Sequence, residues 1–123
     1  MKKLKKELKR DKLIRQVIDI VRKSKPEDFK YLTAGWIARK LGVSLPNLSR
    51  AYTQVMGFNL REVLLRARIF KSVNLMRKKP HLSIKKISEM IDYNNSSYFI
   101  HVHVERYGIS PGKLRDLMKS DNP

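Results

Sequence analysis

One stretch toward the C-terminal end, residues 84–111, most constrains the fold: IKKISEMIDYNNSSYFIHVHVERYGISP. Its first three isoleucines recur at helical spacing, which predicts a short amphipathic helix. The residues that follow, 92–95, read Asp-Tyr-Asn-Asn and predict a turn, because Asn and Asp side chains bond the nearby backbone and tolerate unusual φ angles. Ser96 is expected to cap a second helix by accepting a backbone N–H.

The end of this second helix and the start of a third are marked by a glycine and a serine–proline pair. Gly108 suits the left-handed residue that terminates a helix. Ser110 is expected to be an N-cap, with Pro111 at the favoured first helical position. Two helices joined by a short turn form a helix-turn-helix arrangement, whose second helix can enter the major groove of DNA.

A weak repeat of this unit lies fifty residues earlier in the chain. Thr33 is expected to cap a helix over residues 34–41, and residues 42–44 to form the turn. Pro46 then starts a second helix, which Gly57 ends. The aligned pairs are Thr33 with Ser83, Ala38 with Ser88 and Gly42 with Asp92, fifty residues apart, and Leu48 with Phe99, Tyr52 with His103 and Gly57 with Gly108, fifty-one apart.

Three further helices are predicted outside the two repeated units. The first has an apolar stripe over residues 14–21 and is followed by a charged connector over residues 25–31. Asn59 is expected to cap a long helix over residues 60–78, whose apolar side chains, Phe70 among them, spread around it. A last helix is expected over residues 111–118. Val55, near the end of the helix that starts at Pro46, is expected to face inward. In the last helix the side chains expected to face inward are Leu114, Leu117 and Met118.

These elements predict an all-α chain of about seven helices. Its expected parts are a first helix-turn-helix lobe with a basic tail over residues 1–58, a linker helix over residues 59–78 and a second lobe over residues 79–123. The tail, residues 1–12, carries seven Lys or Arg and two acidic residues. It is either a solvated helix start or an additional phosphate-binding arm.

The charge of the chain points to a polyanionic partner. The net charge is +17, with a pI near 10.4, and a compact fold with that excess repels itself. Nucleic acid is the first candidate partner and an anionic membrane surface the second. There are no cysteines, and no apolar run long enough for a signal peptide or a membrane span, so we expect a soluble protein that is not exported.

The pattern as a whole resembles the DNA-binding domain of the AraC/XylS family of bacterial transcription regulators. The resemblance covers residues 14–117 and rests on the long spacing of the matches in both units. The matching residues of the second unit are Ile84, Ile87, Tyr93, Ser97-Tyr98-Phe99, Tyr107-Gly108, Ser110-Pro111 and Arg115. Those of the first unit and the linker are Ala38, Leu41-Gly42-Val43-Ser44, Leu48-Ser49-Arg50, Gly57, Arg68-Ile69 and Leu75-Met76.

Three residues depart from the family pattern. Asp92 occupies a position that is usually glycine, and Asp is among the better-tolerated substitutes where φ is positive. His103 occupies a core position that is usually Phe, where an imidazole must satisfy two ring nitrogens. Ser88 replaces the usual alanine. In addition, His101 lies where many members carry arginine, which implies a different readout at that position.

The resemblance implies that the outer face of the second helix in each unit contacts DNA bases. Arg50 has the fork that suits guanine O6 and N7, Asn47 can pair with adenine, and Ile100 can touch a thymine methyl. The full set of expected DNA-binding residues is Pro46, Asn47, Ser49, Arg50, Thr53, Ser96, Ser97, Ile100 and His101. Candidates for phosphate contacts on the first helix of each unit are Thr33, Arg39, Lys40, Ser83, Lys85 and Lys86.

Catalysis and metal binding have little support in the sequence. Ser83 and Lys86 have Ser-x-x-Lys spacing, but Ser83 is better interpreted as a helix cap and the partner motifs are missing. His101 and His103 are two residues apart, whereas metal pairs on a helix need a spacing of three or four. We therefore expect no catalytic site, no metal and no cofactor.

The function expected from the resemblance is sequence-specific binding of double-stranded DNA in transcription regulation. Two units allow one monomer to read an asymmetric site, with helices about 34 Å apart if they follow one helical turn. RNA polymerase is a possible second partner, and the bacterial cytoplasm, at the nucleoid, the expected location. The chain resembles small stand-alone regulators, or it is the DNA-binding part of something longer. Two alternatives are a basic protein that coats DNA without specificity and a membrane-surface protein bound by its first helix.

Overall fold

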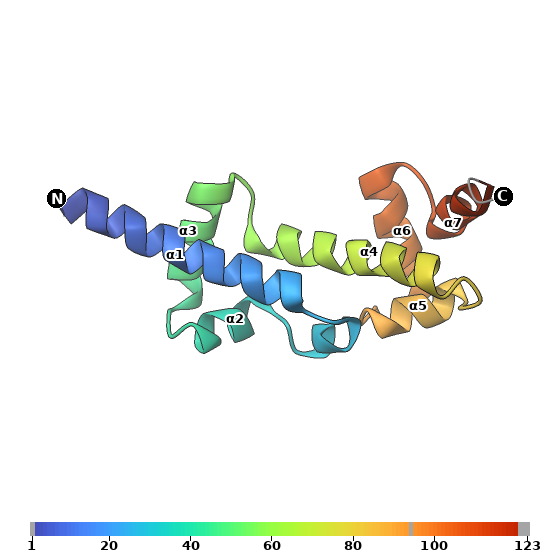
Figure 1. Ribbon diagram of the computed structural model, residues 1–123, viewed down its shortest axis with the longest axis horizontal. Coiled ribbons are helices and arrows are strands. Elements are labelled where there is room, and N and C mark those ends of the chain that lie inside the picture. The colour runs from blue at the N-terminus through green and yellow to red at the C-terminus, as the bar shows by residue number, and fades with distance from the viewer. Residues whose placement is uncertain (1, 94, 121–123) are drawn as a thin grey trace. The chain divides into compact units, whose positions relative to one another are not determined.

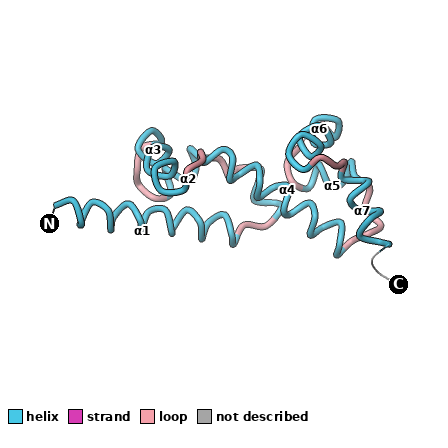
Figure 2. Tube along the Cα trace, turned by 90° about the horizontal axis from the view of Figure 1, so that it is seen from above, coloured by secondary structure: helices cyan, strands magenta, loops and turns pink. Residues whose placement is uncertain are grey.

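The computed structural model describes residues 2–93 and 95–120, with side chains for residues 8–93 and 95–119. These residues form seven α-helices and one short 3-10 helix, η1, and the described part of the chain contains no strand. Figures 1 and 2 show the succession of helices. In chain order they are α1 (Lys2–Lys23), η1 (Pro26–Lys30), α2 (Ala34–Lys40), α3 (Leu45–Met56), α4 (Leu60–Lys78), α5 (Ile84–Met90), α6 (Ser96–Tyr107) and α7 (Pro111–Ser120).

The internal contacts of the chain form two compact units, Met1–Ala67 and Arg68–Pro123, whose boundary lies inside α4. The division is based only on the contacts between residues within each unit. The finer division into a first lobe, a separate linker helix and a second lobe stays a prediction. The all-α fold class is confirmed, and six of the seven helices lie where they were predicted, to within a few residues at their ends. The first helix extends well beyond its predicted apolar stripe, since α1 already begins at Lys2, and a phosphate-binding role of this basic start stays a prediction.

In the first unit, α3 packs against both α1 and α2 (Figure 1). The core takes one face from each of these helices, together with η1 and the start of α4. Its fully or nearly fully buried residues are Ile14, Val17, Val21, Phe29, Leu32, Ile37, Ala38, Leu48, Tyr52, Leu60 and Leu64. Each large side chain among them contributes about 1.5–3 kcal/mol by leaving water, so this core holds α3 against α1 and α2.

In the second unit, α6 packs against α5 and α7 (Figure 2). The buried residues come from the second half of α4, from α5 and the turn that follows it, and from the inner face of α6. They are Ile69, Ser72, Leu75, Met76, Ile87, Ser88, Ile91, Tyr93, Phe99, Val102 and His103. Aromatic rings are in contact through this core, since the Phe99 ring lies 5.5 Å from the tilted Tyr93 ring and 5.9 Å from the His103 ring, which it meets edge to face.

The turns of the two units repeat in their hydrogen bonds. Gly42 and Asp92 both have positive φ, 70° and 66°. In the first unit Val43 N donates to Ala38 O at 3.0 Å, and fifty residues later Tyr93 N donates to Ser88 O at 2.8 Å. These bonds close the Schellman turn that ends a helix. The predicted repeat is therefore confirmed at the level of backbone geometry, and Asp92 adopts the left-handed conformation expected of it.

Most of the predicted helix caps are present. Thr33 Oγ1 accepts from Trp36 N at 3.1 Å, and Ser83 Oγ accepts from Lys86 N at 3.0 Å. Asn59 and Ser110 likewise accept from the backbone N–H three residues later. Gly57 and Gly108 end α3 and α6 in the left-handed conformation.

The cap of α6 differs from the prediction. Asn95 is the N-cap, and its Oδ1 accepts from Ser97 N at 2.9 Å and from Tyr98 N at 3.2 Å. Ser96 is instead the first residue of the helix. The amide oxygen of Asn95 serves two backbone donors where a serine hydroxyl usually serves one, which explains why the cap lies one residue earlier. Asn94, the other asparagine of this predicted turn, lies outside the described residues.

Several apolar side chains expected to be inward are exposed. Val55 is 38% exposed and Leu117 50% exposed, and both lie near the C-terminal end of their helices. Phe70 of α4, for which no inward position was predicted, is 63% exposed. Conversely, the charged connector after α1 forms η1 and buries Phe29 completely. There Asp28 accepts from Lys25 N and from the Tyr31 hydroxyl, and these bonds lower the pKa of Asp28.

Candidate nucleic-acid interface

The outer face of α3 presents the first group of candidate residues. Ser44 caps the helix, its Oγ accepting from Asn47 N at 3.2 Å, and Pro46 lies in the first turn, where its missing N–H costs nothing. Leu48 and Tyr52 are fully buried on the opposite face. The core therefore fixes the rotation of α3 and turns its outer face to solvent. On that face Pro46, Asn47, Arg50 and Thr53 are exposed and Ser49 is half-buried.

Gln54 extends this face and was not among the predicted residues. It is exposed, and its Oε1 accepts from Arg10 Nη1 of α1 at 3.4 Å. It follows Arg50 by four residues, so the two side chains lie on one side of the helix. An amide there is chemically suited to adenine N6 and N7. The signal was available in the sequence, since helical spacing from Pro46 and Arg50 leads directly to Gln54.

The outer face of α6 presents the second group. Ser97 and His101 are exposed, Ile100 is 38% exposed and Ser96 is half-buried. His101 Nε2 lies 3.4 Å from Glu105 Oε2, with both side chains largely in solvent, so the pair contributes little to stability. The Glu105 carboxylate nevertheless lies on the same face as His101. This face therefore carries a mixture of small, apolar and ionisable groups, in contrast to the arginine-bearing face of α3.

Val104 also belongs to the outer face of α6 and was not predicted. It is 43% exposed and lies four residues after Ile100, so the two aliphatic side chains are neighbours. It also lies fifty-one residues after Thr53, which is the repeat offset already used for Gly57 and Gly108. Applying that offset to every candidate of α3 would have identified it.

The phosphate-contact candidates occupy different positions in the two units. Arg39 and Lys40 lie in the last turn of α2, where cations interact favourably with the helix dipole. The Lys40 ammonium lies 5.2 Å from the centre of the Trp36 ring, a cation–π contact. Lys85 and Lys86 lie in the first turn of α5, where the dipole disfavours positive charge. All four are exposed, as are Thr33 and Ser83, whose oxygens accept cap hydrogen bonds.

Two arginines of α4 lie against aromatic rings, one in each unit. The Arg66 guanidinium lies 4.5 Å from the Phe58 ring in the first unit, and that of Arg68 lies 5.5 Å from the Tyr93 ring in the second. Burial raises the pKa of the Tyr93 hydroxyl, with Arg68 acting in the opposite direction. Burial raises the pKa of Tyr52 in the same way, against the effect of Arg66.

His103 is a core residue, as predicted. It is fully buried, and its Nδ1 lies 2.6 Å from Ile109 O. Because a carbonyl oxygen only accepts, Nδ1 is the donor of this hydrogen bond. Among the described residues Nε2 has no hydrogen-bond partner. The imidazole therefore satisfies one of its two nitrogens and ties the end of α6 to the loop before α7.

Other kinds of site find no support in the described part of the chain. It contains no group of three or more His, Cys, Asp or Glu side chains placed to hold a metal ion. None of the described helices is long and apolar enough to cross a membrane. Ser83, half of the short Ser-x-x-Lys match, is occupied as a helix cap.

A family model described as a helix-turn-helix domain matches residues 37–116. Among solved structures, the chain is similar to the C-terminal domain of AraT, a response regulator from Geobacillus stearothermophilus. The two share 27% identity with a TM-score of 0.74, over 85% of this chain and 84% of that one. No curated protein sequence matches the chain significantly.

Two further solved structures share the fold. One is the C-terminal domain of the two-component response regulator yesN from Fusobacterium nucleatum subsp. nucleatum ATCC 25586, with 24% identity, a TM-score of 0.69, and coverage of 80% of this chain and 93% of that chain. The other is a DNA-binding transcriptional dual regulator from Escherichia coli K-12, with 20% identity, a TM-score of 0.73, and coverage of 88% and 93%.

Two repeated helix-turn-helix units with exposed second helices define a DNA-binding domain. The chain belongs to the AraC-type helix-turn-helix family, the DNA-binding domains of transcription regulators. Its function is sequence-specific binding of double-stranded DNA in transcription regulation. The family expected from the sequence is thereby confirmed.

Proposed function

We propose that each unit inserts its second helix, α3 or α6, into the major groove and that the two helices read bases by different chemistry. The observation that carries this proposal is the matched exposure of the two outer faces, each backed by a fully buried inner face. A helix fits the major groove, and its outward side chains are then the ones that meet base edges. The net charge of +17 supplies the attraction to phosphate.

The first unit is assigned hydrogen-bonding readout. Arg50 is the strongest candidate, because its planar fork donates two bonds to guanine O6 and N7. Asn47 is the candidate for adenine, with Ser49 and Thr53 beside them. Pro46 at the start of the helix makes apolar contact. The exposure of Pro46, Asn47, Arg50 and Thr53 on the outer face of α3, with Ser49 half-buried among them, supports the assignment.

The second unit is assigned a readout with fewer direct hydrogen bonds. Ile100 is suited to a thymine methyl, and His101, Ser96 and Ser97 supply short donors. The Glu105 carboxylate beside His101 opposes approach to phosphate and favours a base donor such as cytosine N4. We therefore expect the second unit to contribute less discrimination than the first.

Lys85 and Lys86 are the preferred phosphate contacts. Both lysines lie in the first turn of α5, where the helix dipole disfavours positive charge at a cost of about 0.3–1 kcal/mol each. Residues that depart from such a local preference are expected at functional sites. Arg39 and Lys40 are weaker candidates, because the last turn of α2 already favours them. Thr33 and Ser83 add hydroxyl donors at the helix starts.

We further propose that a monomer reads one asymmetric site through its two units, with no catalytic activity of its own. RNA polymerase is the proposed second partner, and the nucleoid in the bacterial cytoplasm the proposed location. The solved structures that resemble the chain come from bacteria, which supports this placement.

The test of this proposal compares two duplexes across a salt series by fluorescence anisotropy. One carries a sequence recovered from a random pool, and the other is its scrambled version. We expect tighter binding to the selected duplex, by a factor of about 10³ or more at physiological salt, with a negative salt slope for both. Equal affinity for both duplexes at every salt concentration would instead favour a coating protein.

A further inference from the structure

A pocket in the second unit lies apart from the outer face of α6. It has a volume of about 360 Å³ and is lined by Met76 and Arg77 of α4, by Pro80, and by Arg115, Met118 and Lys119 of α7. Pockets for small molecules commonly begin at about 300 Å³. The pocket is thus large enough for a small organic molecule, and the described residues that line it are apolar or cationic, with no carboxylate among them.

Arg115 carries the unexplained chemistry of this pocket. Its Nε and Nη2 atoms are buried, and neither has a hydrogen-bond partner among the described residues. Guanidinium N–H donors withdrawn from water are costly unless they are paired with an acceptor, ideally an anion. Nε and Nη2 form one edge of the guanidinium, which matches the two oxygens of a carboxylate or phosphate group once the Arg115 side chain turns that edge into the pocket.

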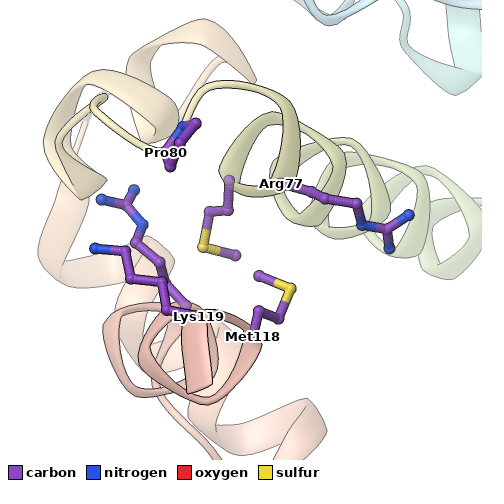
Figure 3. A pocket seen from close by; sticks show the side chains of 6 residues that line it. Arg77, Pro80, Met118 and Lys119 are labelled. Atoms are coloured by element: carbon purple, nitrogen blue, oxygen red, sulfur yellow. The ribbon is translucent and has the colours of Figure 1, made fainter. Parts of the chain in front are cut away.

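The neighbouring side chains determine the kind of anion. Lys119 lies four residues after Arg115, on the same side of α7, and adds a second cation. Figure 3 shows Met118 and Lys119 projecting from α7 and Pro80 on the opposite side, whereas the Arg77 side chain extends away from them along α4. The two full charges of Arg115 and Lys119 outweigh the partial negative charge, about half an elementary charge, at the end of α4.

We propose that this pocket binds a small organic anion whose carboxylate or similar acidic group pairs with Arg115 and Lys119. Its apolar body lies against Met76, Met118 and Pro80. Methionine side chains adapt to irregular apolar ligands, which suits a pocket of this composition. Arg77 lies at the edge of the site and is not required for the pairing.

The first experiment uses NMR of the full chain labelled with ¹³C at the methionine methyl groups. The probes are hexanoate, hexan-1-ol as the neutral analogue of equal length, and inorganic phosphate. We expect hexanoate to shift the Met76 and Met118 signals in a saturable way while Met56 and Met90 stay unchanged. Hexan-1-ol and phosphate are each expected to bind at least tenfold more weakly, because each lacks one half of the ligand.

The second experiment tests the cation. Arg115→Gln is expected to weaken hexanoate binding by about tenfold or more, because it removes a charge-assisted pair. The matched control is Lys113→Gln, which removes one positive charge from an exposed position of α7 outside the pocket and is expected to leave binding unchanged. If Arg115→Gln does not fold, Lys119→Gln takes its place, with a smaller loss expected.

The proposal is overturned if hexanoate shifts none of the methionine signals or if phosphate binds as tightly as hexanoate. It is also overturned if the control Lys113→Gln weakens hexanoate binding as much as Arg115→Gln does. Addition of a DNA duplex separates the two sources of an acidic group. A duplex that displaces hexanoate competitively identifies the natural anion as a DNA phosphate and overturns the proposal of a free ligand. Because all of these readouts follow the pocket itself, they are independent of whether α3 and α6 read bases as proposed.

Discussion

Replacing Asp92 by glycine is expected to stabilise the chain, because Asp92 holds a left-handed conformation that glycine adopts without steric cost. Its φ is 66°, and the equivalent Gly42 in the first unit has φ 70°. A left-handed residue costs an L-amino acid about 1–2 kcal/mol, with Asp near the low end. Glycine offsets about 0.4–1 kcal/mol of this gain, because it gives the unfolded chain more conformational freedom and so favours unfolding. The net gain is therefore about 0.5 kcal/mol.

The exchange in the first unit provides the matched control. A Cβ built on Gly42 meets no atom within 4 Å, so Gly42→Asp adds backbone strain without a clash. It is expected to lower the free energy of unfolding by a similar amount. Asp92→Ala is expected to lower it by about 1 kcal/mol, because alanine lacks the local hydrogen bonding that helps Asp tolerate this conformation.

Thermal unfolding followed by circular dichroism measures these differences. For a domain of this size, 0.5 kcal/mol corresponds to a change of about 1–4 °C in Tm. The expected order in the second unit is glycine above aspartate above alanine. A lower Tm for Asp92→Gly, or a higher one for Gly42→Asp, would show that backbone strain at this turn does not govern the difference between the units.

Three further substitutions test the assignments of the interface and the core. Arg50→Ala is expected to cost about 1–3 kcal/mol of binding to the preferred duplex and to relax one base position, and an unchanged preference in a selection experiment would contradict its role in base readout. Lys85→Ala combined with Lys86→Ala should weaken binding to all duplexes alike and reduce the salt slope by about two; a loss confined to one sequence would count against phosphate contact. His103→Phe is expected to raise the free energy of unfolding by about 1 kcal/mol, measured by denaturant titration. The substitution removes the buried, unpartnered Nε2 and adds apolar burial, and these gains are expected to exceed the loss of the hydrogen bond to the carbonyl of half-buried Ile109. A lower free energy of unfolding would refute this balance.

Much of the fold could be predicted because local chemistry and the global fold agree in this chain. The caps at Thr33, Asn59, Ser83 and Ser110 each depend on one side chain and the backbone three residues later, so the sequence suffices to identify them. The left-handed conformation at Asp92 follows from its alignment with Gly42. Such features need no knowledge of distant contacts.

The exposure of single side chains could not be predicted where it depends on contacts with segments that are distant in sequence. Val55 and Leu117 have inward spacing but are exposed, since helical periodicity does not report which part of a helix a neighbouring element covers. Phe29 is surrounded by charged residues in sequence, yet the 3-10 turn of η1 directs it into the core. The unpartnered nitrogens of Arg115 depend on which side chains surround them, so no motif announces the pocket.

The most direct test of the central claim is selection of bound sequences from a random duplex pool, performed in parallel with the wild-type chain, Arg50→Ala and Ile100→Ala. We expect the wild-type motif to have two separate elements about one helical turn apart. Arg50→Ala is expected to relax the element that α3 reads and to leave the other unchanged. Ile100→Ala is expected to relax the element that α6 reads and to leave that of α3 unchanged. A single element affected by both substitutions, or no motif in the wild-type pool, would contradict a chain that reads DNA with two chemically different helices.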